Sequence, residues 1–237
     1  MEPAFFDQDE VYLPDSPLGR RERRMRESIR EFVEICGACL PIKEPIYEFG
    51  SLQVPGQEGF ADLRSIFPNK KYVGADMREG PGVDVVLNLH KIDLNSESAG
   101  TVLMLDTLEH VEYSREALKE VHRILKKDGI VIMSSVMNFP IHDFPYDYWR
   151  FTPQAFKSLL TDFKYSYVES CGEPSFPHTV VGVGFKGGFS DDSLKDFAAR
   201  IEAWKKKWSK GTASRKRRAV SLLIPPIGST AIKKIRK

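Results

Sequence analysis

Short runs of hydrophobic residues alternate with segments of helical periodicity from about residue 45 onward. Strands are predicted at 46–49, 72–75, 83–89, 102–105 and 130–134. Two later runs, at 165–170 and 180–185, are close enough in the sequence to pair as an antiparallel hairpin. Strands alternating with helices predict an α/β fold built on a mostly parallel sheet.

Capping residues and periodic apolar positions locate the helices. Ser16 followed by Pro17 predicts a helix start, because serine can cap free amides and proline at the first position has no amide to leave unbonded. This helix is expected to end before Pro41 and to carry a salt-bridged, arginine-rich outer face. Further helices are predicted at 60–67, from Ser114 to about Gly129, from Thr152 to about 163, and at 191–208.

The chain of 237 residues is long enough for one well-buried domain with appendages. We expect an N-terminal helical cap at 1–44, the main domain at 45–189, a C-terminal helix at 190–210 and a basic tail at 211–237. With 41% hydrophobic residues and three cysteines, the composition excludes collagen-like, low-complexity and disulfide-scaffold proteins. Cys36 and Cys39 form a C-x-x-C pair without a second pair, so we expect them to be reduced and structural.

The charge is divided unevenly along the chain. Twelve of the 35 basic residues and none of the 33 acidic residues lie at 205–237, which leaves 23 basic against 33 acidic residues before it. The first 204 residues therefore carry −10 and the tail +12. We expect the tail to pack on the body or on a second subunit; contact with an anionic membrane surface through 215–237 is the next alternative, and nucleic-acid binding is the least favoured. A solvated tail is the simplest alternative.

Neither a targeting segment nor a membrane-spanning segment is predicted. The first ten residues contain four acids and no basic residue ahead of an apolar run, unlike a secretory signal. No stretch reaches the ~18 uninterrupted apolar residues that a membrane-spanning helix needs. We therefore expect a cytoplasmic protein, with peripheral contact at the inner membrane surface as an option for the tail.

Polar residues and glycines follow the predicted strands, where ligands bind in an open parallel sheet. Glu48 and Gly50 end the first strand, and Asp76 ends the second at a spacing that suits hydrogen bonds from both ribose hydroxyls of a nucleoside. Asn88 ends the third strand, where its amide could pair with an adenine edge, and Asp106 ends the fourth. The sequence therefore favours a nucleoside-containing ligand.

Four segments, in order, resemble the motifs of class I S-adenosylmethionine-dependent methyltransferases of the type 11 branch. They are Glu48-Phe49-Gly50, Gly74-Ala75-Asp76, VLMLDTLEHV at 102–111 and LKEVHRILKKDGIVI at 118–132. FPIHDFPYDYWRFTP at 139–153, with its H-x-x-P-x-D-Y-x-R-F-T-P pattern, is similar to a segment of bacterial members that modify sugars or other small polar acceptors. The resemblance covers about 45–163 and makes 45–189 the methyltransferase domain. It implies a Rossmann-like, seven-stranded, mostly parallel sheet with helices on both faces and the last strand antiparallel.

The resemblance also implies the cofactor, S-adenosylmethionine, and the residues around it. Glu48 and Gly50 would border its methionine end, Asp76 would bind the ribose, Met77 would pack on the adenine, Asn88 and Leu89 would meet the adenine edge, and Asp106 and Thr107 would lie near the sulfonium and the acceptor. The loop after Gly50 lacks the family's second glycine and is longer, which motivates a rival interpretation as a non-catalytic Rossmann-like binding protein. It also argues against a nicotinamide dehydrogenase, which needs Gly-x-Gly-x-x-Gly.

Methyl transfer to a hydroxyl needs an aligned nucleophile and a group that removes its proton. The candidate bases are His110, His142 and Asp106, and we favour His142 because it lies in the polar, aromatic loop after the fifth strand. Its alternative role is to orient that loop through backbone hydrogen bonds. No metal is predicted, because His90, His122 and His178 show no shared ligand spacing.

The segment 146–150 gathers aromatic and cationic residues that could bind an acceptor. Tyr146 could stack on a sugar ring and Arg150 could pair with an anion, whereas Trp149 is expected in the core. We therefore predict an S-adenosylmethionine-dependent methyltransferase that acts at oxygen on a small-molecule or glycan-type acceptor. A nucleic-acid (RNA or DNA) methyltransferase guided by the basic tail is the other alternative, and an oligomeric state is not predicted.

Overall fold

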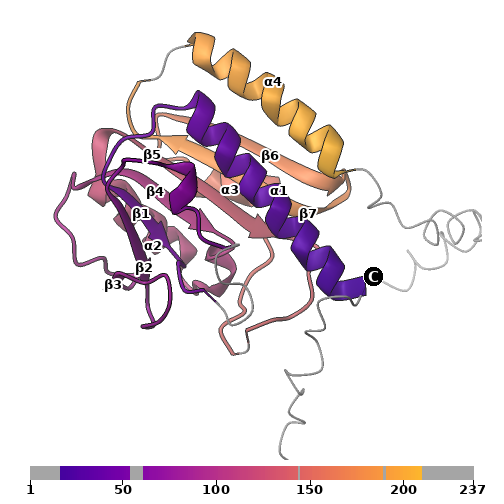
Figure 1. Ribbon diagram of the computed structural model, residues 1–237, viewed down its shortest axis with the longest axis horizontal. Coiled ribbons are helices and arrows are strands. Elements are labelled where there is room, and N and C mark those ends of the chain that lie inside the picture. Colours follow the sequence, from indigo (N-terminus) through magenta and orange to yellow (C-terminus); the bar gives the residue numbers. More distant parts are fainter. Residues whose placement is uncertain (1–16, 54–60, 144, 189–190, 210–237) are drawn as a thin grey trace, which may run out of the picture.

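The computed structural model describes residues 17–53, 61–143, 145–188 and 191–209, and only the backbone at 17–26 and 191–193. A seven-stranded sheet runs through the middle of this region in the order β3-β2-β1-β4-β5-β7-β6 (Figure 1). Its strands are β1 Ile46–Phe49, β2 Tyr72–Asp76, β3 Val85–Val86, β4 Ala99–Leu105, β5 Leu125–Val136, β6 Tyr165–Glu173 and β7 Phe176–Phe185. The strands β1 to β5 pair in parallel, and β7 lies antiparallel between β5 and β6. The expected Rossmann-like fold with its antiparallel last strand is confirmed.

Helices cover both faces of the sheet. The helices α1 (Pro17–Cys39) and α4 (Asp191–Trp208) lie side by side over one face, joined by a 2.7 Å hydrogen bond from Trp204 Nε1 to the Ser28 carbonyl (Figure 1). The helices α2 (Ser114–Ile124) and α3 (Pro153–Leu159) cover the other face. Two single-turn 3-10 helices, η2 (Arg64–Ile66) and η3 (Leu108–His110), follow the first and fourth strands.

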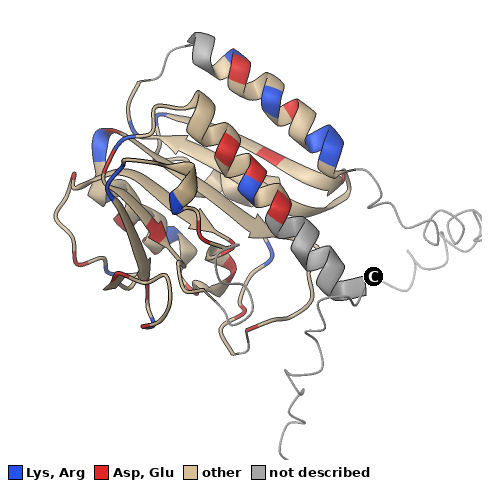
Figure 2. Ribbon diagram, viewed as in Figure 1, with Lys and Arg blue, Asp and Glu red and all other residues tan. Residues whose placement is uncertain are grey.

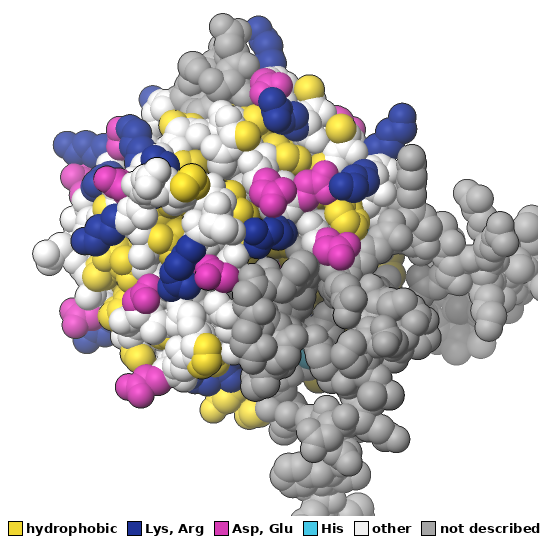
Figure 3. Space-filling view, viewed as in Figure 1, with side chains coloured by type: hydrophobic (Ala, Val, Ile, Leu, Met, Phe, Trp, Pro, Cys, Tyr) yellow, Lys and Arg dark blue, Asp and Glu magenta, His cyan; other side chains and the backbone are white. Residues whose placement is uncertain are grey.

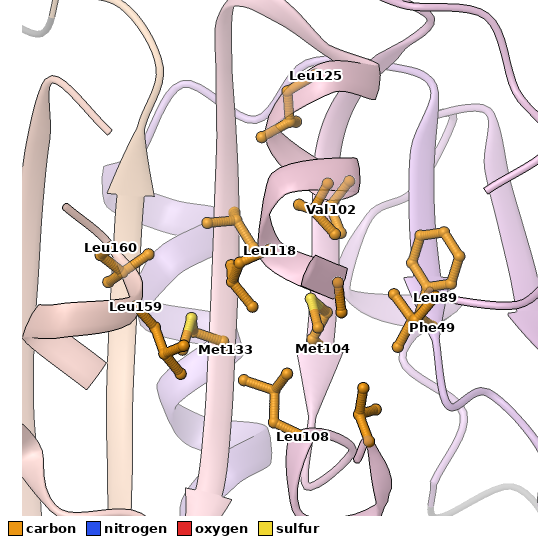
Figure 4. Packing of buried hydrophobic residues seen from close by; sticks show 14 of the residues in the cluster. Phe49, Leu89, Val102, Met104, Leu108, Leu118, Leu125, Met133, Leu159 and Leu160 are labelled. Atoms are coloured by element: carbon orange, nitrogen blue, oxygen red, sulfur yellow. The ribbon is translucent and has the colours of Figure 1, made fainter. Parts of the chain in front are cut away.

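The period-two pattern of the central strands divides the core into two layers. Val102 and Met104 of β4 point to the layer under α2 and α3, whereas Leu103 points to the layer under α1 and α4. Figure 4 shows the first layer, in which Leu118 of α2 and Leu159 of α3 meet the sheet. Because both faces are covered, apolar residues predominate on both sides of the central strands, as in most parallel sheets.

Several predicted elements have other bounds in the structure; the helix predicted to reach about 163, for example, is α3 at Pro153–Leu159. The helix expected to reach Gly129 ends at Ile124, because buried Leu125 has extended backbone and pairs with Ala99 of β4. Gly129 is instead a close-contact position, since a Cβ there would stand 3.0 Å from the Gly100 carbonyl oxygen. The third strand is shorter than predicted, and the helix expected at 60–67 is only the turn η2 in the described part of that range.

The surface over α1 and α4 mixes both signs of charge (Figure 3), while lysines gather in the last turn of α4 (Figure 2). Within the described ranges, the structure contains no helix with the length and apolar character needed to cross a bilayer. The basic tail at 211–237 and the arginine-rich side chains near residue 20 lie outside the described residues and side chains, so the predictions about them stay predictions.

Candidate active site

The carboxyl ends of β1, β2 and β4 bring the first group of predicted residues together. Gly50 donates its backbone N–H to the Ala75 carbonyl at 2.9 Å, and Thr107 Oγ1 donates to the Phe49 carbonyl at 3.0 Å. Gly50 has φ +83°, and a Cβ there would stand 2.3 Å from Thr107 Oγ1. Only glycine fits this position, so the end of β1 passes directly against the turn after β4.

Asp76 lies at the tip of β2 with its carboxylate nearly buried. Its Oδ1 accepts a hydrogen bond from the Arg78 amide at 3.0 Å, and the amide of Leu52 stands 3.4 Å from Oδ2. These two amides fix the carboxylate while the longer contact leaves Oδ2 with capacity for another donor. Next to it, the apolar side chain of Met77 is 60% exposed.

Glu48 is held inside the sheet rather than at its surface. Tyr72 donates its hydroxyl hydrogen to Glu48 Oε2 at 2.7 Å. Burial raises the pKa of Glu48 to about 7, although the Tyr72 hydrogen bond and nearby Arg64 oppose the shift. Close by, the buried hydroxyl of Ser51 has no hydrogen-bond partner among the described residues. Two polar groups at the end of β1 thus lie close to the predicted cofactor site.

Asn88 and Leu89 occupy the loop after β3. The oxygen Oδ1 of Asn88 accepts the His90 amide at 2.9 Å, so this side chain folds back on its own loop. Leu89 is buried in the core under α2. Only the exposed Asn88 therefore offers a polar side chain at the predicted adenine edge.

Asp106 begins a sharp turn after β4. Its φ of +47° is unusual for a residue other than glycine, and the Ser134 hydroxyl holds it by donating to Asp106 Oδ1 at 2.8 Å. This turn leads directly into η3, whose residues Glu109 and His110 reach toward the loop at 139–150. Asp106 and Thr107 therefore lie between the end of β1 and that loop.

His142 lies beside two residues of η3, Glu109 and His110. Each of the three side chains has one nitrogen or oxygen atom, of the kind that could bind a metal ion, within 4.8 Å of the other two. The rings of His110 and His142 meet edge to face with centroids 4.7 Å apart. Glu109 is fully buried, which, together with the Asp106 charge, raises its pKa well above the usual range. Burial and the neighbouring His110 lower the pKa of His142, so its ring is neutral at pH 7.

Sequence reasoning missed this cluster. It considered the two histidines as bases or as structural residues and gave no role to Glu109, because 109, 110 and 142 show no regular ligand spacing. The available signal was an acid directly before a histidine in the turn after an apolar strand.

The loop at 139–150 is organised by Arg150, for which an acceptor-binding role was predicted. All five of its N–H donors have partners: the Asp147 carboxylate takes two, and the carbonyls of Phe139, Pro140 and Trp149 take the others. The Asp147 side chain is only 2% exposed and also accepts the His142 amide at 2.8 Å. Arg150 is thus committed to the loop itself.

The aromatic residues of the same loop face outward. Tyr146 is 50% exposed, and its carbonyl oxygen stands 3.0 Å from His110 Nδ1. The prediction that Trp149 belongs to the core is wrong, since it is 46% exposed and its Nε1 lies 3.1 Å from the carbonyls of Val111 and Glu112. These hydrogen bonds hold the indole at the surface, because its polar edge must reach backbone acceptors.

Residues 60–133 match the family model described as a methyltransferase domain. Among solved structures, the chain is similar to an S-adenosylmethionine-dependent methyltransferase, a possible histamine N-methyltransferase, from Thermotoga maritima; the identity is 23% and the TM-score 0.50, over 72% of this chain and 96% of that one. A protein from Pyrococcus horikoshii OT3 aligns at 16% identity and TM-score 0.51, over 76% of this chain and 99% of that one. None of the curated proteins matches the sequence significantly.

At these identities the solved structures establish the fold, and the family match adds the activity class. The chain carries a methyltransferase domain on a Rossmann-like sheet. The match at 60–133 indicates a methyltransferase, and the similar protein from Thermotoga maritima is described as dependent on S-adenosylmethionine. The roles of individual residues, the acceptor and the atom that receives the methyl group remain proposals.

Proposed function

We propose that the enzyme methylates a hydroxyl oxygen of a small-molecule or glycan-type acceptor bound between the tip of β4 and the loop at 139–150. The observation that carries this proposal is the position of His142, which lies beside Glu109 and His110 at the carboxyl edge of the sheet with its Nδ1 turned to the Pro140 carbonyl. A neutral imidazole can accept the proton that a hydroxyl must lose.

The residues at the tips of β1 and β2 fit the cofactor. The exposed side chain of Met77 offers an apolar surface to an adenine ring, and the Asp76 carboxylate beside it offers acceptor capacity to ribose hydroxyls. The unpartnered Ser51 hydroxyl and the side-chain-free Gly50 suit the close approach of the amino-acid end, which Glu48 would also border. Asn88 would meet the adenine edge, and Leu89 would support that loop from the core.

When bound, S-adenosylmethionine supplies a methyl carbon: its bond to sulfur breaks, the electron pair stays on sulfur, and a new bond forms from the acceptor oxygen to that carbon. The Nδ1 atom of His142 faces the Pro140 carbonyl at 3.2 Å, and because a carbonyl only accepts, Nδ1 carries the ring proton. The lone pair of Nε2 is therefore the one that would take the hydroxyl proton. Asp106 and Thr107 would position the acceptor near the sulfonium.

Exposed aromatic rings favour an acceptor with an apolar or sugar-ring face. Tyr146, Tyr148 and Trp149 are 50%, 41% and 46% exposed along the same loop. Such rings stack on the C–H groups of sugars and on other flat surfaces. Tyr146 would contact the acceptor directly, while Arg150 would act as a positioning residue by holding the loop.

Calorimetric titration with S-adenosylhomocysteine tests the cofactor site. We expect Asp76→Ala to weaken binding at least tenfold, because the ribose would lose its carboxylate partner. Asp162→Ala, at an exposed aspartate beyond α3, is the matched control and should bind as the wild type does. Equal affinities of wild type and Asp76→Ala would contradict the assignment, and transfer of labelled methyl groups only to amines would contradict the assignment to oxygen.

A further inference from the structure

We infer that Glu109, His110 and His142 bind one divalent metal ion of the zinc type beside the acceptor site. The metal site itself stands on the geometry of these three residues; its use by the acceptor rests on the proposed function. The site is formed by η3 and the loop at 139–150, which the fold brings together although His110 and His142 are 32 positions apart in the sequence.

The oxygen Oε1 of Glu109 points to a missing partner. Glu109 is fully buried, Ser135 donates its hydroxyl hydrogen to Oε2 at 2.7 Å, and Oε1 has no hydrogen-bond partner among the described residues. An ionised Oε1 would lack a donor there, and a protonated one would lack an acceptor. A buried polar atom without a partner destabilises the fold, so it calls for an explanation. A cation next to Oε1 would remove this cost.

The two imidazoles are arranged as metal ligands commonly are. His110 Nδ1 stands 3.0 Å from the Tyr146 carbonyl, and His142 Nδ1 stands 3.2 Å from the Pro140 carbonyl and 3.3 Å from the Asp147 carboxylate. Both Nδ1 atoms therefore carry protons, and both Nε2 atoms keep a lone pair. Histidine ligands typically donate their other ring N–H to a carbonyl or carboxylate, which fixes the tautomer and the ring orientation. Ser135 plays the same part for the carboxylate of Glu109.

The donor set indicates the kind of ion. Two imidazole nitrogens and one carboxylate oxygen suit zinc and its neighbours in the first transition row, whereas magnesium and calcium prefer oxygen ligands alone. Ligands of a tetrahedral zinc stand about 3.4 Å apart. The present spread of up to 4.8 Å would need modest side-chain rotations. Three protein ligands leave a fourth position open, which is typical of a catalytic rather than a structural site.

A metal ion here would change the role of His142. Its Nε2 can bind a metal or take a proton, but not both, so the ligand role and the base role exclude each other. An acceptor hydroxyl in the open position would lose its proton more easily, because the ion stabilises the alkoxide. The Asp106 carboxylate adds negative charge beside Glu109, which favours a cation there, whereas the charge of Asp147 is balanced by Arg150.

Titration of EDTA-dialysed protein with Co²⁺ and Zn²⁺ tests this inference. We expect one equivalent to bind, with the visible absorption bands of a low-coordinate Co²⁺ site, and Zn²⁺ to displace it. Glu109→Gln and His142→Gln should each weaken binding at least tenfold. His122→Gln, whose ring packs on Phe163 in another part of the molecule, is the matched control and should bind as the wild type does.

Thermal melting shows whether each variant is folded, and the visible spectrum of wild-type protein provides a result that needs no variant. No uptake of Co²⁺ by folded wild type, or equal uptake by Glu109→Gln and His142→Gln, would overturn the inference. Titration with S-adenosylhomocysteine separates it from the proposed function. Bound S-adenosylhomocysteine without bound Co²⁺ would sink only the metal site and would leave His142 available as the base. Bound Co²⁺ without bound S-adenosylhomocysteine would sink the cofactor site, and binding of both would keep methyl transfer but assign activation of the acceptor hydroxyl to the metal ion instead of His142.

Discussion

The two sides of the candidate site are built in different ways. On the cofactor side, the tips of β1, β2 and β4 are joined by short contacts that involve backbone, such as the 2.9 Å bond from the Gly50 amide to the Ala75 carbonyl. On the acceptor side, the loop at 139–150, whose described residues form neither helix nor strand, is held by side chains, chiefly the Arg150–Asp147 pair and its carbonyl partners. The first side tolerates almost no added volume, whereas the second depends on a few polar groups.

This difference suits the two ligands that a methyltransferase binds. One cofactor serves a whole family, so a close-packed backbone site can be kept while the rest of the chain varies. Acceptors differ among enzymes, and a loop fixed by side chains can be reshaped without disturbing the sheet. We therefore expect the cofactor side to be sensitive to added side-chain volume and the acceptor side to be sensitive to the loss of polar groups.

The largest loss of folding stability is expected from Gly50→Ala on the cofactor side. The new Cβ would stand 2.3 Å from Thr107 Oγ1 at φ +83°, so the strand tips must separate. Positive φ and overpacking together cost about 2–5 kcal/mol. Chemical unfolding measures this loss, and S-adenosylhomocysteine affinity should fall with it. Gly188→Ala is the control because nothing lies within 4 Å of its Cβ position. Equal stability of the two variants would mean that the two tips are not closely packed.

A smaller difference in folding stability, which depends on pH, is expected between wild type and Glu48→Gln. Burial raises the pKa of Glu48 from 4.5 to about 7, so the folded state holds this proton more tightly than the unfolded state. The resulting stability is fully present below pH 4.5 and is lost as the pH rises through about 7, by at most about 3 kcal/mol. Wild type should therefore lose stability relative to Glu48→Gln between pH 5 and 8 in urea unfolding.

Glu34→Gln, at an exposed position on α1, is the matched control and should show no such pH-dependent difference from wild type. A constant difference between wild type and Glu48→Gln across this range would show that Glu48 is ionised in the fold. The cofactor side would then contain a charged carboxylate below pH 7, where burial is expected to keep Glu48 protonated.

The same contrast explains what the sequence could reveal. Strand tips could be predicted because apolar runs end where polar residues begin, and the structure brings Gly50 and Thr107 together as that rule implies. The extent of β5 could not be predicted from the sequence, since Leu125 belongs to a strand because it pairs with Ala99 of β4. Local patterns locate elements, but long-range pairing decides where they end.

The acceptor side was harder to predict, because its contacts join residues that share no periodicity. Arg150 is a plausible anion-binding residue in the sequence, and only the structure shows that its donors are all in use. The aromatic Trp149 is a plausible core residue, yet two backbone carbonyls hold its indole at the surface. Glu109 becomes a candidate site residue only because its carboxyl group is buried in the structure. Each of these facts depends on partners that are distant in the chain.

The smallest effect on stability is expected from Arg150→Lys on the acceptor side. Lysine has three donors on one nitrogen and cannot reproduce the planar fork, so at least two of five hydrogen bonds are lost, at a cost of about 2 kcal/mol. Amide hydrogen exchange at 139–150 should quicken, and the KM for the acceptor should rise, while S-adenosylhomocysteine affinity stays within twofold. Arg115→Lys, which loses only bonds to Ser158, is the control. Unchanged exchange in the loop would show that Asp147 and Arg150 do not hold it, and a loss of cofactor affinity would mean that the two sides are coupled.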